Sequence, residues 1–187
     1  MRFQFGRAPA DVFIILGNLV NRRTDLIRAT TSNTWKHVIA VPGPADADHK
    51  DIYMRLCNDN NIILLDNQSV ILGETRFIGS TMWSRDANIF WNEEDEDAVL
   101  KELKIAASCN DISILLTSSP PRYEWMQAVA AAGAQPRAVF YPDDKRAISG
   151  TAGGIFFYGC NSKSPEKDIV FSYGRGGSGS GYATPPN

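Results

Sequence analysis

The sequence is poor in histidine and cysteine and has no long apolar run, and each scarcity excludes a class of protein. Its three cysteines, Cys57, Cys109 and Cys160, are odd in number and scattered, which favours free thiols in a reducing compartment over a disulfide framework. No apolar run approaches the roughly 20 residues that a membrane-spanning helix needs. The net charge is only −2, so neither a membrane surface nor a nucleic acid is an expected partner.

The length of the chain, 187 residues, predicts one folded domain and a short tail. We place the domain at residues 1–172, because residues 173–187 are mainly glycine, serine and proline and cannot bury a core. Residues 1–5 are too few for the apolar core of a signal peptide. We therefore expect a protein of the cytoplasm or of another reducing intracellular compartment.

An apolar run closed by glycine, residues 12–17, indicates the fold class. A short continuous apolar run that ends in a turn signal is typical of a strand buried on both faces. Such strands lie in sheets that are covered by helices, which predicts an α/β fold. Ligands of these sheets bind at the loops that leave the carboxyl ends of the strands. Gly17 and Asn18 form the first such loop, so the candidate site begins there.

Strand and helix patterns alternate along the rest of the chain. Apolar runs and caps predict strands at residues 37–41, 62–65, 70–72, 76–79, 112–117, 138–141, 154–158 and 168–171, and helices at residues 19–32, 46–60, 92–108 and 123–132. The close spacing of the strands between residues 62 and 79 predicts antiparallel hairpins and hence a mixed sheet. We predict that strands 12–16, 37–41 and 112–116 are adjacent at the centre of the same sheet.

An acidic run and the two histidines are the first places to look for metal ligands. Residues 93–97 are all acidic and begin a predicted helix. The helix dipole favours a solvated first turn there over a metal site. His37 opens a buried strand and His49 lies in the first turn of a helix. We expect each histidine to be structural or solvated rather than a metal ligand.

Three short motifs follow three of the predicted strands, and together they resemble a known family. They read Gly-Asn-Leu-Val-Asn-Arg at residues 17–22, Pro-Gly-Pro-Ala-Asp at 42–46 and Thr-Ser-Ser-Pro-Pro at 117–121. Their order resembles the calcineurin-like metallophosphoesterases over roughly residues 10–162. Residues 76–83 are similar to a non-catalytic signature of one bacterial and viral branch. The resemblance implies mixed β-sheets sandwiched between helices, here with a truncated first strand. Placement of the three central strands in different sheets is expected to overturn it.

Matched by position, the chain lacks the metal ligands of that family, which binds two metal ions ~3.5–4 Å apart. The family's first motif, Asp-x-His, has no counterpart. The fifth motif falls best on residues 141–144, with residues 159–162 as the weaker alternative, and neither stretch contains histidine. Asp46 keeps an acidic position, and we expect it to cap the helix that it begins. The former site positions are Asn18, Pro44, Ala45, Asp46, Ser118, Ser119, Asp143 and Asp144.

The neutral side chains of Asn18, Ser118 and Ser119 cannot offset the charge of two divalent ions. We therefore expect a catalytically inactive metallophosphoesterase-like protein, a pseudoenzyme with no catalytic residue and no bound metal or cofactor. Its expected role is that of a structural or interaction component of a larger assembly. Its expected partners are other protein chains, and a viral or phage particle is one candidate assembly.

Two alternatives belong to other classes of function. The first is a metal-dependent phosphoesterase with a rebuilt, reduced site, in which Asn18, Asp46, Asp143 and Asp144 bind one Mg²⁺ or Mn²⁺. The second is a nucleic-acid binder, which is not favoured because the glycine-rich tail carries a single arginine, Arg175.

The missing first strand leaves one side of strand 12–16 to be covered. Residues 1–5 alternate apolar and polar side chains, unlike a doubly buried strand. An open apolar edge is an association liability. We expect residues 1–5, a neighbouring chain, or the chain's own strand 155–158 or 169–171 to cover this edge.

Overall fold

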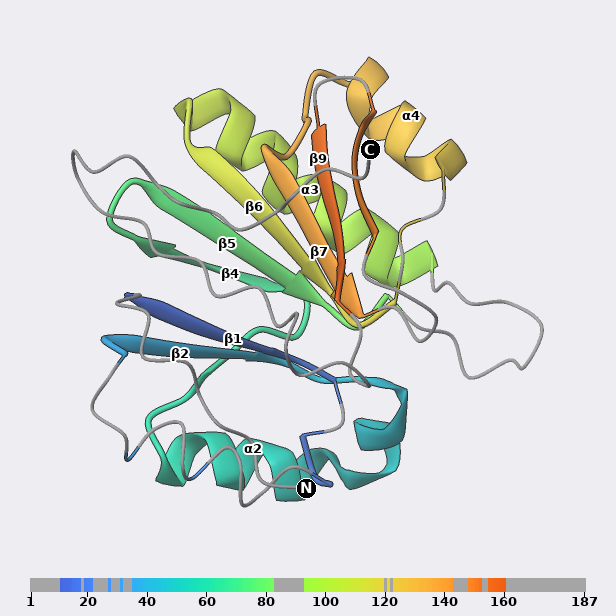
Figure 1. The fold of residues 1–187 in the computed structure, drawn as a ribbon. Coiled ribbons are helices and arrows are strands. Elements are labelled where there is room, and N and C mark those ends of the chain that lie inside the picture. The colour runs from blue at the N-terminus through green and yellow to red at the C-terminus, as the bar shows by residue number, and fades with distance from the viewer. Residues whose placement is uncertain are drawn as a thin grey trace.

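The chain folds into two packed β-sheets with helices on both outer faces (Figure 1). The computed structural model describes residues 11–17, 19–21, 27, 31, 35–82, 93–119, 121, 123–142, 148–152 and 155–160. The predicted α/β class, with mixed sheets between helices, is confirmed in this part of the chain. No helix in the described part is long and apolar enough to cross a membrane.

The first sheet is parallel and has the order β1-β2-β3. Its strands are β1 (Val12–Leu16), β2 (His37–Val41) and the short β3 (Ile63–Leu64). The helix α2 (Lys50–Asp59) covers its outer face (Figure 1). The apolar runs predicted from the sequence do form strands, of which β2 is largely buried and β1 and β3 are mostly half-buried. The core between these strands and α2 includes Ile15, Leu19, Val38, Tyr53, Leu56 and Cys57.

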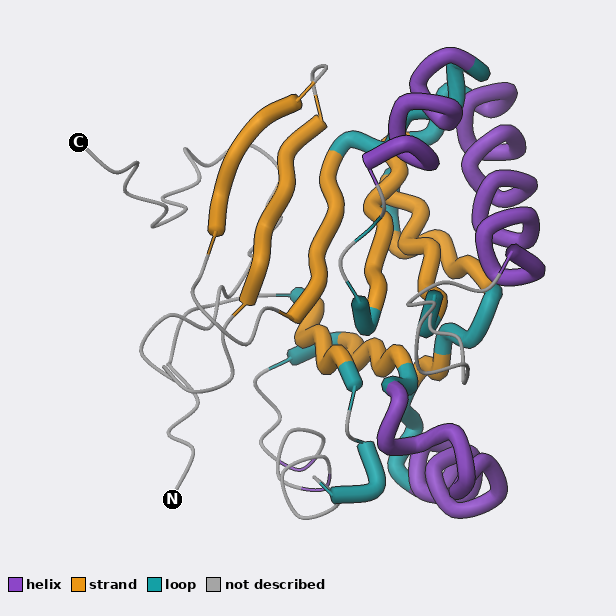
Figure 2. The backbone as a smooth tube through the Cα atoms, turned by 90° about the vertical axis from the view of Figure 1, so that its right-hand side faces the viewer, coloured by secondary structure: helices purple, strands orange, loops and turns teal. Residues whose placement is uncertain are grey.

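The second sheet is mixed and has the order β4-β5-β6-β7-β9-β8. Its strands are β4 (Gln68–Leu72), β5 (Thr75–Ser80), β6 (Ile112–Thr117), β7 (Ala138–Pro142), β8 (Ile148–Ala152) and β9 (Ile155–Cys160). Strand β4 is antiparallel to β5 and β8 to β9, while β5, β6, β7 and β9 are parallel. Figure 2 shows α3 (Glu93–Cys109) and α4 (Tyr123–Ala131) on the outer face of this sheet.

The inner faces of the two sheets pack directly on one another. The shared core includes Ile39, Val41, Leu65, Phe77, Leu116 and Phe140. Gly79 on β5 lies at a point of close approach, where an added Cβ would overlap the Cβ of Leu65 and lie 3.0 Å from Val41 Cγ2. Glycine is needed at this position because the neighbouring sheet leaves no room for a side chain.

The predicted order of the central strands is wrong. Strands β1 and β2 are neighbours as expected, but β6 lies in the second sheet, between β5 and β7. Strand β3 pairs in parallel with β2, so of the predicted hairpins only β4–β5 is confirmed. Strand β9 pairs with β7 and β8, so residues 155–158 do not cover β1. Residues 1–5 and 169–171 lie outside the described residues, and cover by a neighbouring chain stays a prediction.

Several local features of the structure differ from the sequence prediction. The segment predicted as a helix at residues 46–60 begins with a 3₁₀ helix, η1 (Pro44–His49), and becomes α-helical only at Lys50. The helical spacing of Ile52, Tyr53, Leu56 and Cys57 predicts one shared apolar face, but Ile52 is 51% exposed. Strand β8 was not predicted. Of the helix predicted at residues 19–32, the structure describes residues 19–21, 27 and 31. Residues 19–21 form a turn rather than the predicted helix, and Ile27 and Thr31 are helical.

Candidate functional site

The carboxyl ends of strands from both sheets meet at one edge of the molecule. The Gly17 N–H donates to the Val41 carbonyl at 2.8 Å, which joins the ends of β1 and β2. A Cβ added to Gly17 would lie 3.5 Å from Gly43 Cα and 3.8 Å from Ser118 Cβ. Gly17 also has a φ of +70°, a conformation that glycine adopts readily. The loops that carry the three motifs therefore converge, although they come from different sheets.

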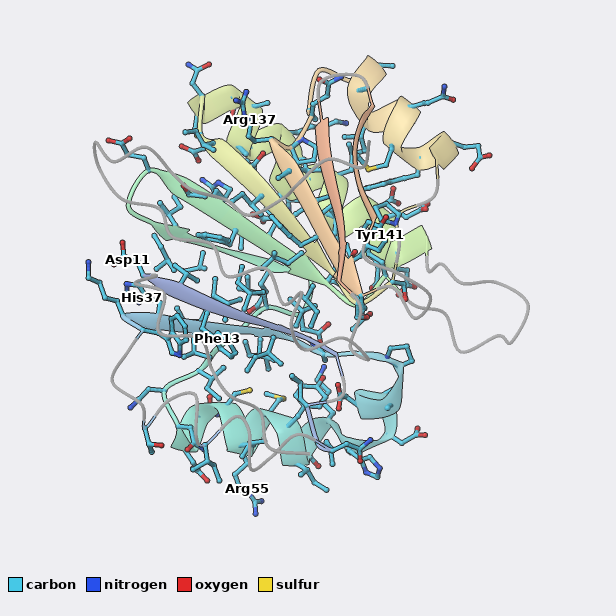
Figure 3. All side chains as sticks on the ribbon, viewed as in Figure 1. Asp11, Phe13, His37, Arg55, Arg137 and Tyr141 are labelled. Carbon is cyan, nitrogen blue, oxygen red and sulfur yellow. The ribbon has the colours of Figure 1, made fainter. Side chains whose placement is uncertain are left out.

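The ends of the strands can be followed in Figure 3. Asp11 and His37 lie at the starts of β1 and β2, at one side of the molecule. Tyr141 lies near the end of β7, toward the other side. Strand β7 is parallel to β6, with Leu116 opposite Phe140, so its last residue, Pro142, reaches the same edge as the end of β6.

Asp46 ties the first two of these loops together. Its side chain is fully buried. The Gly43 N–H donates to Asp46 Oδ2 at 2.8 Å. The helix N-cap is Gly43 and Asp46 is the third helical residue, so Asp46 bonds back to the cap and is not itself the cap that the sequence predicts. The Leu19 and Val20 N–H groups donate to Oδ2 and Oδ1, each at 3.0 Å. Because the carboxylate already accepts these bonds and is closed to solvent, we do not count it as a metal ligand, which corrects the ligand set of the rebuilt-site alternative.

The charge on Asp46 also acts on its surroundings. Burial first, and then the nearby Asp46 carboxylate, raise the pKa of the Cys57 thiol to about 11. Cys57 is therefore a neutral core residue at physiological pH, as the sequence suggests for a buried thiol.

Ser118 and Ser119 follow β6 and are both buried. The Ser118 hydroxyl donates to the Thr81 carbonyl at 2.8 Å, and its N–H donates to the Ser80 carbonyl at 3.3 Å. The Thr117 hydroxyl donates to the Ser119 carbonyl at 2.6 Å. This segment is thus held by the end of β5 and by its own turn. A serine hydroxyl that donates its proton keeps its lone pairs for other partners.

The other predicted positions divide into two groups. Pro44 and Ala45 are exposed on η1 and offer no side-chain ligand, and the two histidines are exposed as well. Asn18, Asp143 and Asp144 lie outside the described residues, although the first follows Gly17 directly and the others follow Pro142.

The side chains at the described part of this edge do not fit a pair of metal ions. No three His, Cys, Asp or Glu side chains gather as a metal site among the residues that the structure describes. The edge offers serine hydroxyls and one buried carboxylate that already accepts three backbone N–H groups. Such donors do not balance two divalent cations.

Sequence reasoning missed a polar cluster beside the edge. Within the acidic run expected to be solvated, Asp95 and Glu96 are only 6% and 7% exposed, so that expectation is wrong for these two residues. Asp95 instead bonds with Asn67 and Thr81. An Asp-Asn turn before a strand was the available signal for Asn67, but its partner is 28 positions further along the chain.

Comparison with solved structures identifies the type of fold. The crystal structure of phosphopantetheinyl hydrolase (PptH) from Mycobacterium tuberculosis matches the chain with a TM-score of 0.52 and 12% identity. The match covers 86% of this chain and 83% of that one. The chain has a metallophosphoesterase-like α/β fold. No family model matches the sequence, and no curated protein does.

This match corrects two expectations. The chain was expected not to be an enzyme, and the finding that it shares its fold with a hydrolase contradicts this. The placement of β6 in a different sheet from β1 was expected to overturn the resemblance. It does not, because two packed sheets can bring the ends of their strands to one edge, as Gly17 and Ser118 show.

Proposed function

We propose that this chain hydrolyses phosphate esters at the edge where β1, β2, β6 and β7 end. The observation that carries the proposal is the approach of Gly17 to Gly43 and Ser118, which joins three motif loops from two sheets. In α/β sheets, ligands bind outside the carboxyl ends of the strands. The hydrolase fold of a solved structure over most of the chain supports the same class of reaction.

The proposed site differs from the two-metal centre of the family that the sequence resembles. The Leu19, Val20 and Gly43 N–H groups are taken by Asp46, so they do not serve a phosphate. The ligands that remain are the amide of Asn18 and the carboxylates of Asp143 and Asp144, which follow β1 and β7 in the sequence. Oxygen ligands of this kind suit one Mg²⁺ or Mn²⁺ ion, a rebuilt and reduced site.

The proposal is tested by turnover of the full chain. Purified protein is mixed with bis(p-nitrophenyl) phosphate or p-nitrophenyl phosphate, with excess Mn²⁺, with excess Mg²⁺, or with EDTA. We expect release of p-nitrophenol from at least one ester with a metal ion and its loss with EDTA. Equal background rates under all conditions, for both esters, would contradict the proposed function.

A further inference from the structure

Four polar side chains from distant parts of the sequence form a hydrogen-bond network beside Ser118. Asp95 Oδ1 accepts a bond from Asn67 Nδ2 at 2.6 Å, and Asp95 Oδ2 accepts one from Thr81 Oγ1 at 3.0 Å. Ser80 Oγ donates to Asn67 Oδ1 at 2.5 Å and accepts the Met82 N–H at 3.2 Å. The network joins the turn before β4, the end of β5 and the first turns of α3.

The network is partly buried, with Asn67 and Thr81 half-buried, and includes a carboxylate, so its bonds are stronger than those of exposed neutral groups. Ser80 is fully buried and Asp95 is 6% exposed. Asn67 has a φ of +56°, in the left-handed region that few residues other than glycine and asparagine adopt. Its side chain is bonded through both its oxygen and its nitrogen, which fixes the turn in this conformation.

Thr81 connects the network to the candidate site. Its hydroxyl bonds with Asp95, and its carbonyl accepts the hydroxyl proton of Ser118 at 2.8 Å. Anchoring the Thr81 side chain also fixes the direction of its carbonyl. The Ser118 hydroxyl therefore donates its hydrogen to the Thr81 carbonyl. The lone pairs of its oxygen stay available at the edge that Gly17 approaches.

We propose that Asp95 is a positioning residue for Ser118 and acts through Thr81. The α3 helix then does more than cover the sheet: Asp95, its third residue, sets the orientation of a hydroxyl at the end of β6. The kinetic consequence rests on the proposed function, whereas the orientation of Ser118 does not depend on it.

The test uses Thr81→Val, which keeps the shape and the carbonyl of Thr81 but removes its bond to Asp95. Thr81→Ser restores a hydroxyl and serves as the rescue variant. Ser69→Ala is the matched control, because the Ser69 hydroxyl also bonds a carboxylate of α3, that of Glu102. The first readout is the NMR chemical shift and hydrogen-exchange rate of the Ser118 amide in the full chain, and the second is the split between kcat and KM for phosphoester turnover.

We expect Thr81→Val to move the Ser118 resonances and to speed exchange of its amide about tenfold, which corresponds to about 1.4 kcal/mol. In Thr81→Ser and Ser69→Ala, the chemical shift and the exchange rate of the Ser118 amide should stay close to those of the parent protein. In turnover, kcat should fall about tenfold with KM unchanged, and Asp95→Ala, which removes the acceptor of the Thr81 bond, should behave as Thr81→Val does. An unchanged Ser118 amide in Thr81→Val, or an equal change in Ser69→Ala, would overturn the inference. If the parent protein shows no turnover but Thr81→Val still changes the Ser118 amide, the proposed function is overturned and the positioning role is retained.

Discussion

The carboxylate of Asp46 lies 3.0 Å from the backbone nitrogen of Leu19 and so joins the loop after β1 to the helix after β2. It also accepts the Val20 and Gly43 N–H groups and is completely buried. A single anionic side chain thus fixes the backbone at two of the three loops that form the candidate site.

Asp46→Asn should destabilise the protein strongly. An amide has one oxygen to accept these bonds, and its NH₂ group would face a backbone donor. We expect a loss of about 3 kcal/mol in the free energy of unfolding, measured by urea denaturation. The control is Asp51→Asn, which changes an exposed carboxylate on α2 and should cost less than about 0.5 kcal/mol. Equal stability of the two variants would contradict the role given to Asp46.

Gly79→Ala should force the two sheets apart. The new Cβ would overlap that of Leu65, which belongs to the facing layer. We expect a loss of about 1–3 kcal/mol in unfolding free energy, the usual range for overpacking. Gly73→Ala is the comparison, since that position is open but has a φ of +65°, and it should cost about 1 kcal/mol. A smaller loss of unfolding free energy in Gly79→Ala than in Gly73→Ala would contradict this, because it would show that the two sheets can shift to admit the new Cβ.

The cysteines should differ in reactivity. Burial and Asp46 raise the pKa of Cys57 to about 11, so at about pH 8 its reactive thiolate is scarce. In a Cys160→Ser background, we expect a thiol reagent to label the exposed Cys109 and to label Cys57 only after unfolding.

The raised pKa of Cys57 also makes stability depend on pH. The thiol ionises first in the unfolded chain, at about pH 8.5, so its contribution to stability is complete below that pH. The contribution falls as pH rises toward about 11, the pKa in the folded protein. Cys57→Ala should remove this part of the alkaline decline, as seen in urea denaturation across the range. An unchanged decline would contradict the assignment.

Cover of the outer side of β1 by a neighbouring chain stays a prediction. In the described part of the structure, β1 ends the sheet order β1-β2-β3. If a neighbouring chain covers this edge, the isolated protein should self-associate, and light scattering should show a mass that rises with concentration. A stable monomer at all concentrations would contradict the partner and favour cover by residues 1–5 or 169–171.

Much of the fold can be predicted from the sequence because its strands are continuous apolar runs. Strands β1, β2 and β6 and the apolar stripe of α3 are found where the pattern places them. The sheet to which each strand belongs cannot be predicted in this way. An apolar run in the middle of either sheet has the same composition, so β6 was assigned to the wrong one.

In the candidate site, too, the contacts between neighbours in the sequence can be predicted and those between distant residues cannot. The bond from the Gly43 N–H to Asp46 is local, and the sequence places Asp46 at the start of this helix, although the N-cap is Gly43 and Asp46 is the third helical residue. The bonds of Asp46 to Leu19 and Val20, and of Asp95 to Asn67, join residues 26 to 28 positions apart. Helix-dipole reasoning favours solvated acids at the start of α3, and it fails for Asp95 because the end of β5 supplies polar partners that only the tertiary structure brings there.

The rate of metal-dependent phosphoester hydrolysis in variants of Asp143 and Asp144 tests the central claim most directly. Asp59→Ala, which removes an exposed carboxylate at the far end of α2, is the control. We predict that Asp143→Ala and Asp144→Ala each lower kcat/KM by about a hundredfold or more, because a bound metal ion supplies several kcal/mol of charge stabilisation. Asp59→Ala should keep the parent rate. Full activity in both site variants would contradict the account, as would a parent protein that hydrolyses neither ester.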